Sequence, residues 1–333
     1  MRRTRTLRSG STHRLRGAVR AMLLPVIMLV GGLIVLVLAA DWLVDGSVGF
    51  ARRIGVPPMV VGLTIVAYGT SLPEFVVSIL ATSREIPAFA IGNIVGSNVA
   101  NIGLVLGTTA LVCPIVVASR AIFRRDLPVL TLVTAASVYF FVDGLVTAAE
   151  GAVLLVVVAV TTFLSLRTPD EEHHVDDDTM KKRKAVLLLV VGMGGLVLGA
   201  HFMVEGGSEI AEMIGISERI IGLTVVAVGT SLPELAAAVA SAAKGHPGLA
   251  VGNVVGSCLF NLAFVMGATA LIQPLAVSPL DVQFELVTMC GLTVVMWLML
   301  GTGKRMSRLE GGLLVTSYVG FLTYVVLSTA RHI

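Results

Sequence analysis

Charged residues are scarce in this chain. Asp, Glu, Lys and Arg together make up 14% of its 333 residues, whereas a soluble domain carries about 25%. So few polar groups cannot cover a water-facing surface, which excludes a soluble enzyme, a nucleic-acid-binding domain and a disordered protein. Cysteine is rare as well. Cys113, Cys258 and Cys290 lie far apart in apolar runs, which excludes a disulfide framework or cysteine metal site and predicts three small core residues.

Long apolar runs fill most of the sequence, since 56% of the residues are hydrophobic. A membrane-spanning helix needs about 20 apolar residues. We therefore predict an all-α integral membrane protein with ten transmembrane helices. Several of these runs contain Gly, Pro and polar residues, which are costly in lipid unless they face a protein-lined cavity. The ten helices are expected near residues 22–45, 59–83, 88–113, 127–143, 146–166, 185–211, 219–243, 248–272, 283–302 and 309–330.

Two motifs recur in the sequence with a constant offset of 160 residues. Residues 62–74 read GLTIVAYGTSLPE and residues 222–234 read GLTVVAVGTSLPE, so 11 of 13 positions are identical. Residues 92–107 read GNIVGSNVANIGLVLG and residues 252–267 read GNVVGSCLFNLAFVMG, so 8 of 16 positions are identical. The chain is therefore expected to be a duplication of one five-helix unit.

An odd number of spans in each unit turns the second unit upside down relative to the first. The loop charges agree with this inversion. The loop after the first span holds Arg52 and Arg53, whereas the matching loop of the second unit holds Glu212 and Met213. Because basic loops favour the cytoplasm, matching loops lie on opposite sides. Inverted repeats are a common plan for secondary transporters, with the binding site near the bilayer midplane at the repeat interface.

Four segments follow from this division: a basic tail at 1–21, a first repeat at 22–166, a linker at 167–184 and a second repeat at 185–333. Loops on the linker side carry 14 basic residues, and loops on the other side, without the tail, carry three. The linker is thus expected to be cytoplasmic and both termini outside, in a cell membrane. The seven Arg of the tail oppose this orientation. We favour a mis-called start, with translation beginning at Met22, over a genuine tail that strains the topology.

Glu74 and Glu234 lie in the middle of apolar spans. An acid within the membrane costs several kcal/mol and is a functional hypothesis by default. No Lys or Arg lies in the core of a predicted span, so a cation from solution is the expected partner. The alternative is a packing residue neutralised by protonation. We favour a cation ligand because both copies carry the same acid in the same context.

Oxygen atoms surround each acid in the first motif. Thr70 and Ser71 precede Glu74 by four and three residues, so all three share one helix face. Pro73 removes a backbone hydrogen bond and loosens the turn that contains Ala67. The second repeat carries the same residue types at the same spacing. Such an all-oxygen set suits a hard cation such as Ca²⁺. The alternative for the hydroxyls is a hydrogen bond to their own helix.

The second motif supplies neutral polar groups spaced four residues apart, on one stripe of a helix. Its glycines permit close helix approach. We expect Asn93 and Asn253 to form hydrogen bonds between helices. The remaining polar residues of the two copies are expected to reach the ion: Ser97, Asn101, Ser257 and Asn261.

The paired G-T-S-L-P-E and G-N-x-x-G-S segments resemble the α-repeats of the sodium/calcium exchangers, within the cation/Ca²⁺ exchanger superfamily. The resemblance covers the chain from about residue 22 and implies an antiporter in which Na⁺ entry drives Ca²⁺ extrusion by alternating access. By motif position it implies metal ligation by Ala67, Thr70, Ser71, Glu74, Ser97, Asn101, Ala227, Thr230, Ser231, Glu234, Ser257 and Asn261. Many relatives carry Asp where Asn261 stands, so this site has two carboxylates rather than three, which weakens the case for K⁺ co-transport.

The sequence thus predicts a Na⁺/Ca²⁺ antiporter without a resident cofactor. Its expected partners are membrane lipid and the transported Ca²⁺ and Na⁺, and no nucleic acid is expected. The sequence does not define an oligomeric state. A Ca²⁺/H⁺ antiporter is the nearest alternative, because protonation of the same carboxylates would also release Ca²⁺. A cation channel is a second alternative, since symmetric broken helices also line pores. An enzyme is not expected, because no Ser–His or Asp pair has catalytic spacing.

Overall fold

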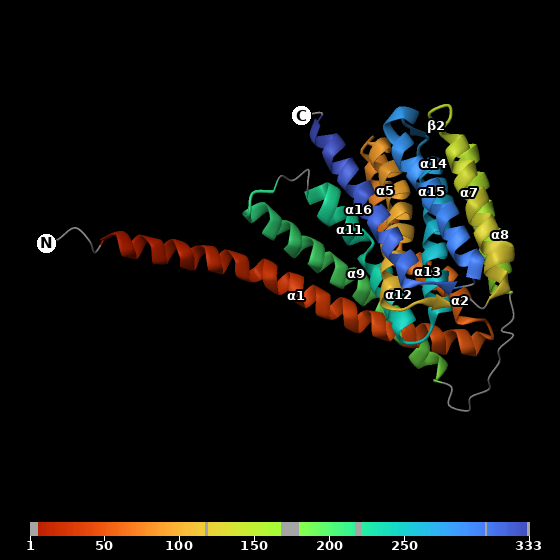
Figure 1. Cartoon of the computed structure of the whole chain (residues 1–333), viewed down its shortest axis with the longest axis horizontal. Helices are drawn as coiled ribbons and strands as arrows, with labels where there is room; N and C mark the ends of the chain where they lie inside the picture. The colour runs from red at the N-terminus through yellow and green to blue at the C-terminus, as the bar shows by residue number, and fades with distance from the viewer. Residues whose placement is uncertain (1–5, 117–118, 168–179, 217–220, 304, 332–333) are drawn as a thin grey trace.

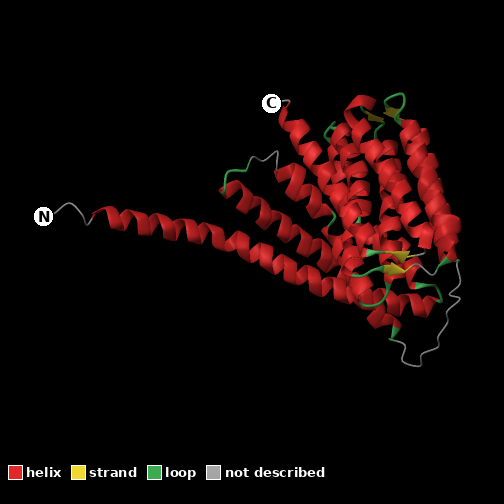
Figure 2. Ribbon diagram, viewed as in Figure 1, coloured by secondary structure: helices red, strands yellow, loops and turns green. Residues whose placement is uncertain are grey.

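The computed structural model describes residues 6–116, 119–167, 180–216, 221–303 and 305–331. Nearly all of these residues are helical (Figures 1 and 2). The linker at 167–184 and its expected cytoplasmic position fall largely outside the described residues. The tail at 1–21 is described in part, because the first helix already begins at Thr6.

Helices of the two halves follow one another in the same order, and five π-helical segments (η) interrupt them. The first half contains α1 (Thr6–Ile54), α2 (Pro58–Val61), η1 (Gly62–Val66), α3 (Ala67–Thr70), α4 (Leu72–Ser83), α5 (Pro87–Ala100), η2 (Asn101–Leu106), α6 (Gly107–Val112), η3 (Ile122–Asp126), α7 (Leu127–Phe140) and α8 (Ala148–Leu166). The second half contains α9 (Lys182–Met213), η4 (Gly222–Val226), α11 (Ala227–Thr230), α12 (Leu232–Ala243), α13 (Pro247–Leu259), η5 (Phe260–Val265), α14 (Met266–Ile272), α15 (Pro279–Gly303) and α16 (Arg308–Arg331).

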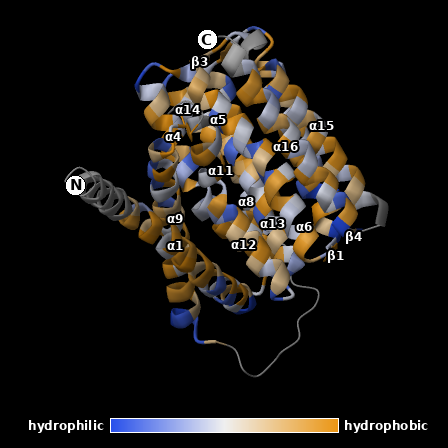
Figure 3. Cartoon of the chain, turned by 60° about the vertical axis from the view of Figure 1, so that its left-hand side comes forward, coloured by the Kyte–Doolittle hydropathy of each residue, from blue (hydrophilic) through white to orange (hydrophobic). Residues whose placement is uncertain are grey.

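The protein is a multi-pass membrane protein. Within the described part of the chain, seven helices are long and apolar enough to cross a membrane, and nine spans result if each of two bent helix pairs counts as one. The remaining span that we expected, at 127–143, coincides with α7, which has only 14 residues. Large apolar side chains such as Val287 and Leu309 are 70% and 76% exposed, and apolar residues cover the outer helices (Figure 3). Lipid is the solvent that suits such a surface.

Two long helices, α1 and α9, lie side by side and are tilted away from the upright bundle (Figure 1). Glycines bring them close together. A Cβ at Gly46 would lie 2.4 Å from the Leu189 backbone nitrogen, and a Cβ at Gly206 would lie 2.9 Å from the Leu29 backbone nitrogen. These two contacts are related by the 160-residue offset. The repeat is therefore visible in packing as well as in sequence.

Four two-residue strands connect the repeats. Strand β1 (Ile115–Val116) pairs with β4 (Arg305–Met306), and β2 (Leu145–Val146) pairs with β3 (Leu275–Ala276). Adding 160 to β1 gives β3, and adding 160 to β2 gives β4, so the two ladders are copies of each other. They lie at opposite ends of the bundle (Figure 2). This is the arrangement that an inverted repeat produces.

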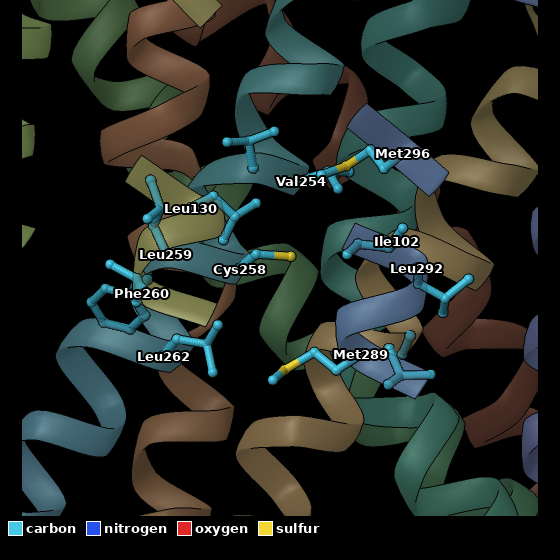
Figure 4. Packing of buried hydrophobic residues seen from close by; sticks show 14 of the residues in the cluster. Ile102, Leu130, Val254, Cys258, Leu259, Phe260, Leu262, Met289, Leu292 and Met296 are labelled. Atoms are coloured by element: carbon cyan, nitrogen blue, oxygen red, sulfur yellow. The ribbon is translucent and has the colours of Figure 1, made fainter. Parts of the chain in front are cut away.

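The main apolar core surrounds α13 and η5, which pass through the middle of the bundle. Cys258 on α13 is fully buried. Figure 4 shows it among Leu130 of α7, Ile102 of η2 and Met289 of α15. These neighbours come from both repeats, so the core itself joins the two halves. Cys258 is thus a core residue, as the sequence predicted, whereas Cys113 and Cys290, which were also expected in the core, are only partly buried.

The turn between α12 and α13 rests on α1. Lys244 Nζ lies 2.6 Å from Asp41 Oδ1 and 2.7 Å from Asp45 Oδ1. Partial burial opposes its charge, but the two carboxylates outweigh that effect and raise the Lys244 pKa. Burial, followed by the charge of Arg52, lowers the pKa of the neighbouring His246. The turn therefore carries a charged Lys beside a largely neutral His at pH 7.

Candidate ion-binding site

Two helix bends position the first motif of each repeat. The helices Pro58–Thr70 and Leu72–Ser83 meet at an angle of 43°, and Thr224–Thr230 and Leu232–Ala243 meet at 49°. Proline stands in the first turn of the second half-helix in each case, where its missing N–H costs little. The same turn carries the glutamate, and a helix N-terminus stabilises negative charge.

The two glutamates come from opposite repeats to one place. Glu74 is 1% exposed and Glu234 is fully buried. Ser71 of the first repeat donates a 2.7 Å hydrogen bond from Oγ to Glu234 Oε1 of the second. The carboxyl groups are close enough for their charges to repel each other. The structure therefore builds one acidic centre from two copies of the motif.

Many polar atoms around these acids have no hydrogen-bond partner among the described residues. A buried polar group left unpaired costs about 1–3 kcal/mol. Nine of the twelve such atoms in the described part of the chain belong to expected ligand residues, which indicates a ligand supplied from solution. These nine atoms are both carboxylate oxygens of Glu74, Oε2 of Glu234, Oγ of Ser231 and Ser257, and the side-chain amide atoms of Asn101 and Asn261.

The threonine hydroxyls bond to their own helices. Thr70 Oγ1 lies 3.1 Å from the Val66 carbonyl oxygen, and Thr230 Oγ1 lies 3.3 Å from the Ala227 carbonyl oxygen. The back-bonding alternative thus applies to both threonines. A hydroxyl that donates to a carbonyl still has lone pairs for a cation, so this bond is compatible with ligation.

The carbonyl groups of Ala67 and Ala227 differ between the repeats. The Ser71 N–H donates to the Ala67 carbonyl at 3.0 Å, which keeps this carbonyl within its helix. In the second repeat the Ser231 N–H donates to the Val228 carbonyl instead. At the proline break, the Ala67 carbonyl therefore accepts from the serine N–H four residues later, whereas the Ala227 carbonyl does not accept from the corresponding Ser231 N–H.

Two asparagines hold the motifs of each repeat together. Asn93 Nδ2 donates to the Glu74 carbonyl at 3.1 Å and to Ser78 Oγ at 2.9 Å. Asn253 Nδ2 donates to the Glu234 carbonyl at 3.3 Å. Both contacts fix the backbone of a glutamate rather than its carboxylate. Hydrogen bonding between helices, which we expected of these asparagines, is confirmed.

A cavity of about 280 Å³ leads away from the site. Three expected ligand positions line it, namely Ser97, Ala227 and Thr230. Its other walls come from α5, α15 and α16, at the end of the bundle where α5 and α15 begin and α16 ends. That end lies opposite the end at which α8 finishes and α9 begins (Figure 1). The site is thus accessible from one face of the bundle.

The matching region of the other face is closed. Ala67 is fully buried and Thr70 is 1% exposed, whereas their copies line the cavity. A Cβ at Gly256 would lie 2.2 Å from the Leu63 carbonyl oxygen. A Cβ at its copy, Gly96, would have nothing within 4 Å. Two segments of nearly identical sequence therefore adopt an open and a closed packing in one structure.

The site combines two carboxyl groups with neutral oxygen ligands. Among the described residues, no group of three or more His, Cys, Asp or Glu side chains is placed to hold a metal ion, so the two glutamates supply the charge. Carboxylates together with hydroxyl, amide and backbone oxygens suit Ca²⁺, which takes six to eight oxygens. They also suit Na⁺, another hard cation. Every expected ligand position is either buried or lines the cavity.

One cavity residue was not found by sequence reasoning. Glu285 of α15 lines the cavity, but it is not among the residues that the two repeats share. The matching residue of the first repeat is Arg125, so a glutamate at this position is not common to the two repeats. Its position near the start of an apolar span was the only available signal.

Comparison with known proteins agrees with this geometry. The family described as "Sodium/calcium exchanger protein" matches residues 24–167 and again residues 184–327, once in each repeat. The putative antiporter CaxA of Alkalimonas amylolytica is 37% identical, over 92% of this chain and 100% of its own length. The sodium/calcium exchanger MaX1 of Methanosarcina acetivorans is 33% identical, over 89% of this chain and 97% of its own.

A solved structure is similar over nearly the whole chain. The sodium-calcium exchanger NCX_Mj, soaked with zero Na⁺ and Ca²⁺, superimposes with a TM-score of 0.80 at 30% sequence identity. The match covers 91% of this chain and 99% of that one. The tilted helix pair, the broken helices and the central bundle therefore form an arrangement already known for an ion exchanger.

Proposed function

The chain belongs to the sodium/calcium exchanger family, and on that premise we propose that it exchanges Na⁺ for Ca²⁺ across the membrane by alternating access. Membership of this family makes it a cation/Ca²⁺ antiporter. The observation that carries the proposal of Na⁺/Ca²⁺ exchange is the cluster of unpaired buried oxygens around Glu74 and Glu234. Such a cluster needs a cation to become stable.

Charge balance explains why the exchange is coupled. One Ca²⁺ neutralises two carboxylates, and two or more Na⁺ ions do so in its place. The two loads compete for the same oxygens and exclude each other. An empty site leaves two buried negative charges uncompensated, so a change of access without cargo is costly. Movement therefore occurs with one load or the other, which is antiport.

The open and closed packing of the two repeats supports alternating access. If the repeats exchange their conformations, the closed contact at Gly256 opens and the open space at Gly96 closes. The cavity then reaches the site from the opposite face. The ligands are nearly unchanged by this exchange, because the two copies of each motif carry the same residue types at these positions.

Contacts between loops support the proposed orientation. Arg53, near the end of α1, donates to the carbonyl of Met180 in the linker. Arg125 donates to the Leu164 carbonyl at the end of α8. With the β1–β4 ladder, these contacts support an arrangement in which the basic loops share one face. By the positive-inside rule this face is cytoplasmic. The cavity then opens to the outside of a cell membrane, with the linker inside and both termini outside.

Flux measurements in proteoliposomes test the proposal. ⁴⁵Ca²⁺ uptake is measured with Na⁺, K⁺ or H⁺ gradients imposed in turn. We expect uptake driven by an outward Na⁺ gradient, and its loss in Glu74→Gln and in Glu234→Gln. Glu85→Gln, in the turn after α4, is the matched control and retains the flux. Uptake driven only by a pH gradient identifies a Ca²⁺/H⁺ antiporter, and uptake that needs no counter-ion identifies a channel. Wild-type flux in either site variant contradicts the assignment of the site.

A further inference from the structure

We propose that Glu285 assists ion entry. Its negative charge raises the local concentration of cations at the outer mouth of the cavity, and it raises the concentration of Ca²⁺ more than that of Na⁺. The inference rests on the proposed function, because it assigns an entry step to that site. Glu285 is half-buried on α15 and lines the cavity that ends at Thr230 and Ser97. It is the one charged side chain among the described residues that line this cavity.

The carboxylate of Glu285 is available to a passing ion. The structure gives it no hydrogen bond and no ion pair within the described part of the chain. Its neighbour Phe284 stacks on Phe321 of α16, with ring centroids 5.8 Å apart and planes inclined by 6°. Phe284 also contacts the ring of Tyr324, at a centroid distance of 4.0 Å. These contacts hold the start of α15 against α16, so the carboxylate has a fixed place in the cavity wall.

On the other face, the described residue at the matching position carries the opposite charge. The copy of Glu285 in the first repeat is Arg125, whose Nε lies 2.7 Å from Asp126 Oδ1. Arg125 is thus neutralised by its neighbour and also bonds to the Leu164 carbonyl. When the repeats exchange conformations, the cavity on the linker side is not lined by a free carboxylate at this position. The effect of Glu285 is therefore confined to entry from one side.

Electrostatics makes the effect depend on the charge of the ion. A negative potential in a narrow cavity with low-dielectric walls raises the local cation concentration. The enrichment grows exponentially with ion charge, so the factor for Ca²⁺ is the square of the factor for Na⁺. One carboxylate at cavity distance gives about fivefold for Ca²⁺ and about twofold for Na⁺. Glu285 thereby favours the dilute divalent ion over the abundant monovalent one.

Sided kinetics of Glu285→Gln test the proposal. KM for Ca²⁺ and for Na⁺ is measured from each face, in right-side-out and inside-out membrane vesicles. We expect KM at the cavity face to rise about fivefold for Ca²⁺ and about twofold for Na⁺, with kcat unchanged and KM at the linker face unchanged. Glu285→Asp restores the parent KM. Glu212→Gln, an exposed carboxylate at the end of α9, is the control and leaves KM unaltered.

Ionic strength separates this role from a structural one. Added choline chloride screens a charge effect, so the KM difference between Glu285→Gln and the parent shrinks as salt rises. A change in packing would persist in salt and would not scale with ion charge. Equal KM values in parent and Glu285→Gln, while the parent exchanges ions, overturn this inference and leave the proposed function intact. A parent without exchange contradicts the proposed function itself.

Discussion

Matched alanine substitutions at Gly96 and Gly256 test whether the repeats exchange conformations. In the structure, a Cβ at Gly96 has free space, whereas a Cβ at Gly256 lies 2.2 Å from the Leu63 carbonyl oxygen and 2.7 Å from Ala67 Cβ. Gly96→Ala should therefore leave the described state unharmed. In the exchanged state, Gly96 faces the backbone of Leu223, the copy of Leu63, and the added methyl group has no room.

The magnitude follows from overpacking. An extra methyl group in a tightly packed site costs about 1–3 kcal/mol, and more against a backbone atom. A bias of about 3 kcal/mol changes a two-state ratio by about 100-fold. Gly96→Ala is expected to hold the protein with its cavity open, and Gly256→Ala to shift it toward the opposite state. Both variants are expected to lose exchange flux, because Gly96→Ala disfavours the exchanged state and Gly256→Ala disfavours the described state.

A cysteine at Val325 in the cavity wall reports the state. In a background without the three native cysteines, its labelling by a membrane-impermeant maleimide is followed together with ⁴⁵Ca²⁺ flux. Gly96→Ala should label at least as fast as the parent, and Gly256→Ala much more slowly. If both substitutions change labelling in the same direction, or if Gly96→Ala exchanges ions normally, the conformational exchange of the repeats is refuted.

Three further predictions concern single side chains. Ser71→Ala removes a hydrogen bond to a carboxylate, worth about 1.5–3 kcal/mol, so the Kd for Ca²⁺ measured by isotope binding should change at least about tenfold; an unchanged Kd contradicts the contact with Glu234. Asn261→Asp adds a third acid to the site, so Ca²⁺ uptake should decline between pH 8 and pH 6 more steeply than in the parent, and coincident pH profiles would refute this. His246 has a lowered pKa, so its neutral form is favoured in the folded protein and acidification below about pH 6.5 removes stability. The Tm in detergent should fall more between pH 7.5 and pH 5.5 for the parent than for His246→Gln, and equal losses would count against the argument.

Repetition in the sequence was sufficient to predict the acidic centre. The constant offset places Glu74 and Glu234 at matching depths of inverted units, so their meeting at the interface follows from topology. The helix break follows from Pro73 and Pro233, because proline cannot continue the hydrogen-bond ladder.

Differences between the repeats could not be predicted in this way. Ala67 is buried and Ala227 is exposed, although the two residues stand in nearly identical motifs. The difference in burial between Ala67 and Ala227 arises from the conformational state of the protein, and the same sequence is expected to adopt both states. Glu285 was missed for a related reason, since it belongs to one repeat alone. The length of one span was also harder to predict, because α7 has only 14 residues where we expected a span over 127–143.

The two small strand ladders have a consequence for biosynthesis. Residues 115–116 pair with residues 305–306, and residues 145–146 pair with residues 275–276. A ribosome that has inserted the first five helices has therefore produced a half whose strand edges and acidic side chain await residues not yet translated. The first half therefore remains incompletely folded in the bilayer until the second half has been synthesised. During this period a membrane chaperone or a quality-control protease has access to it.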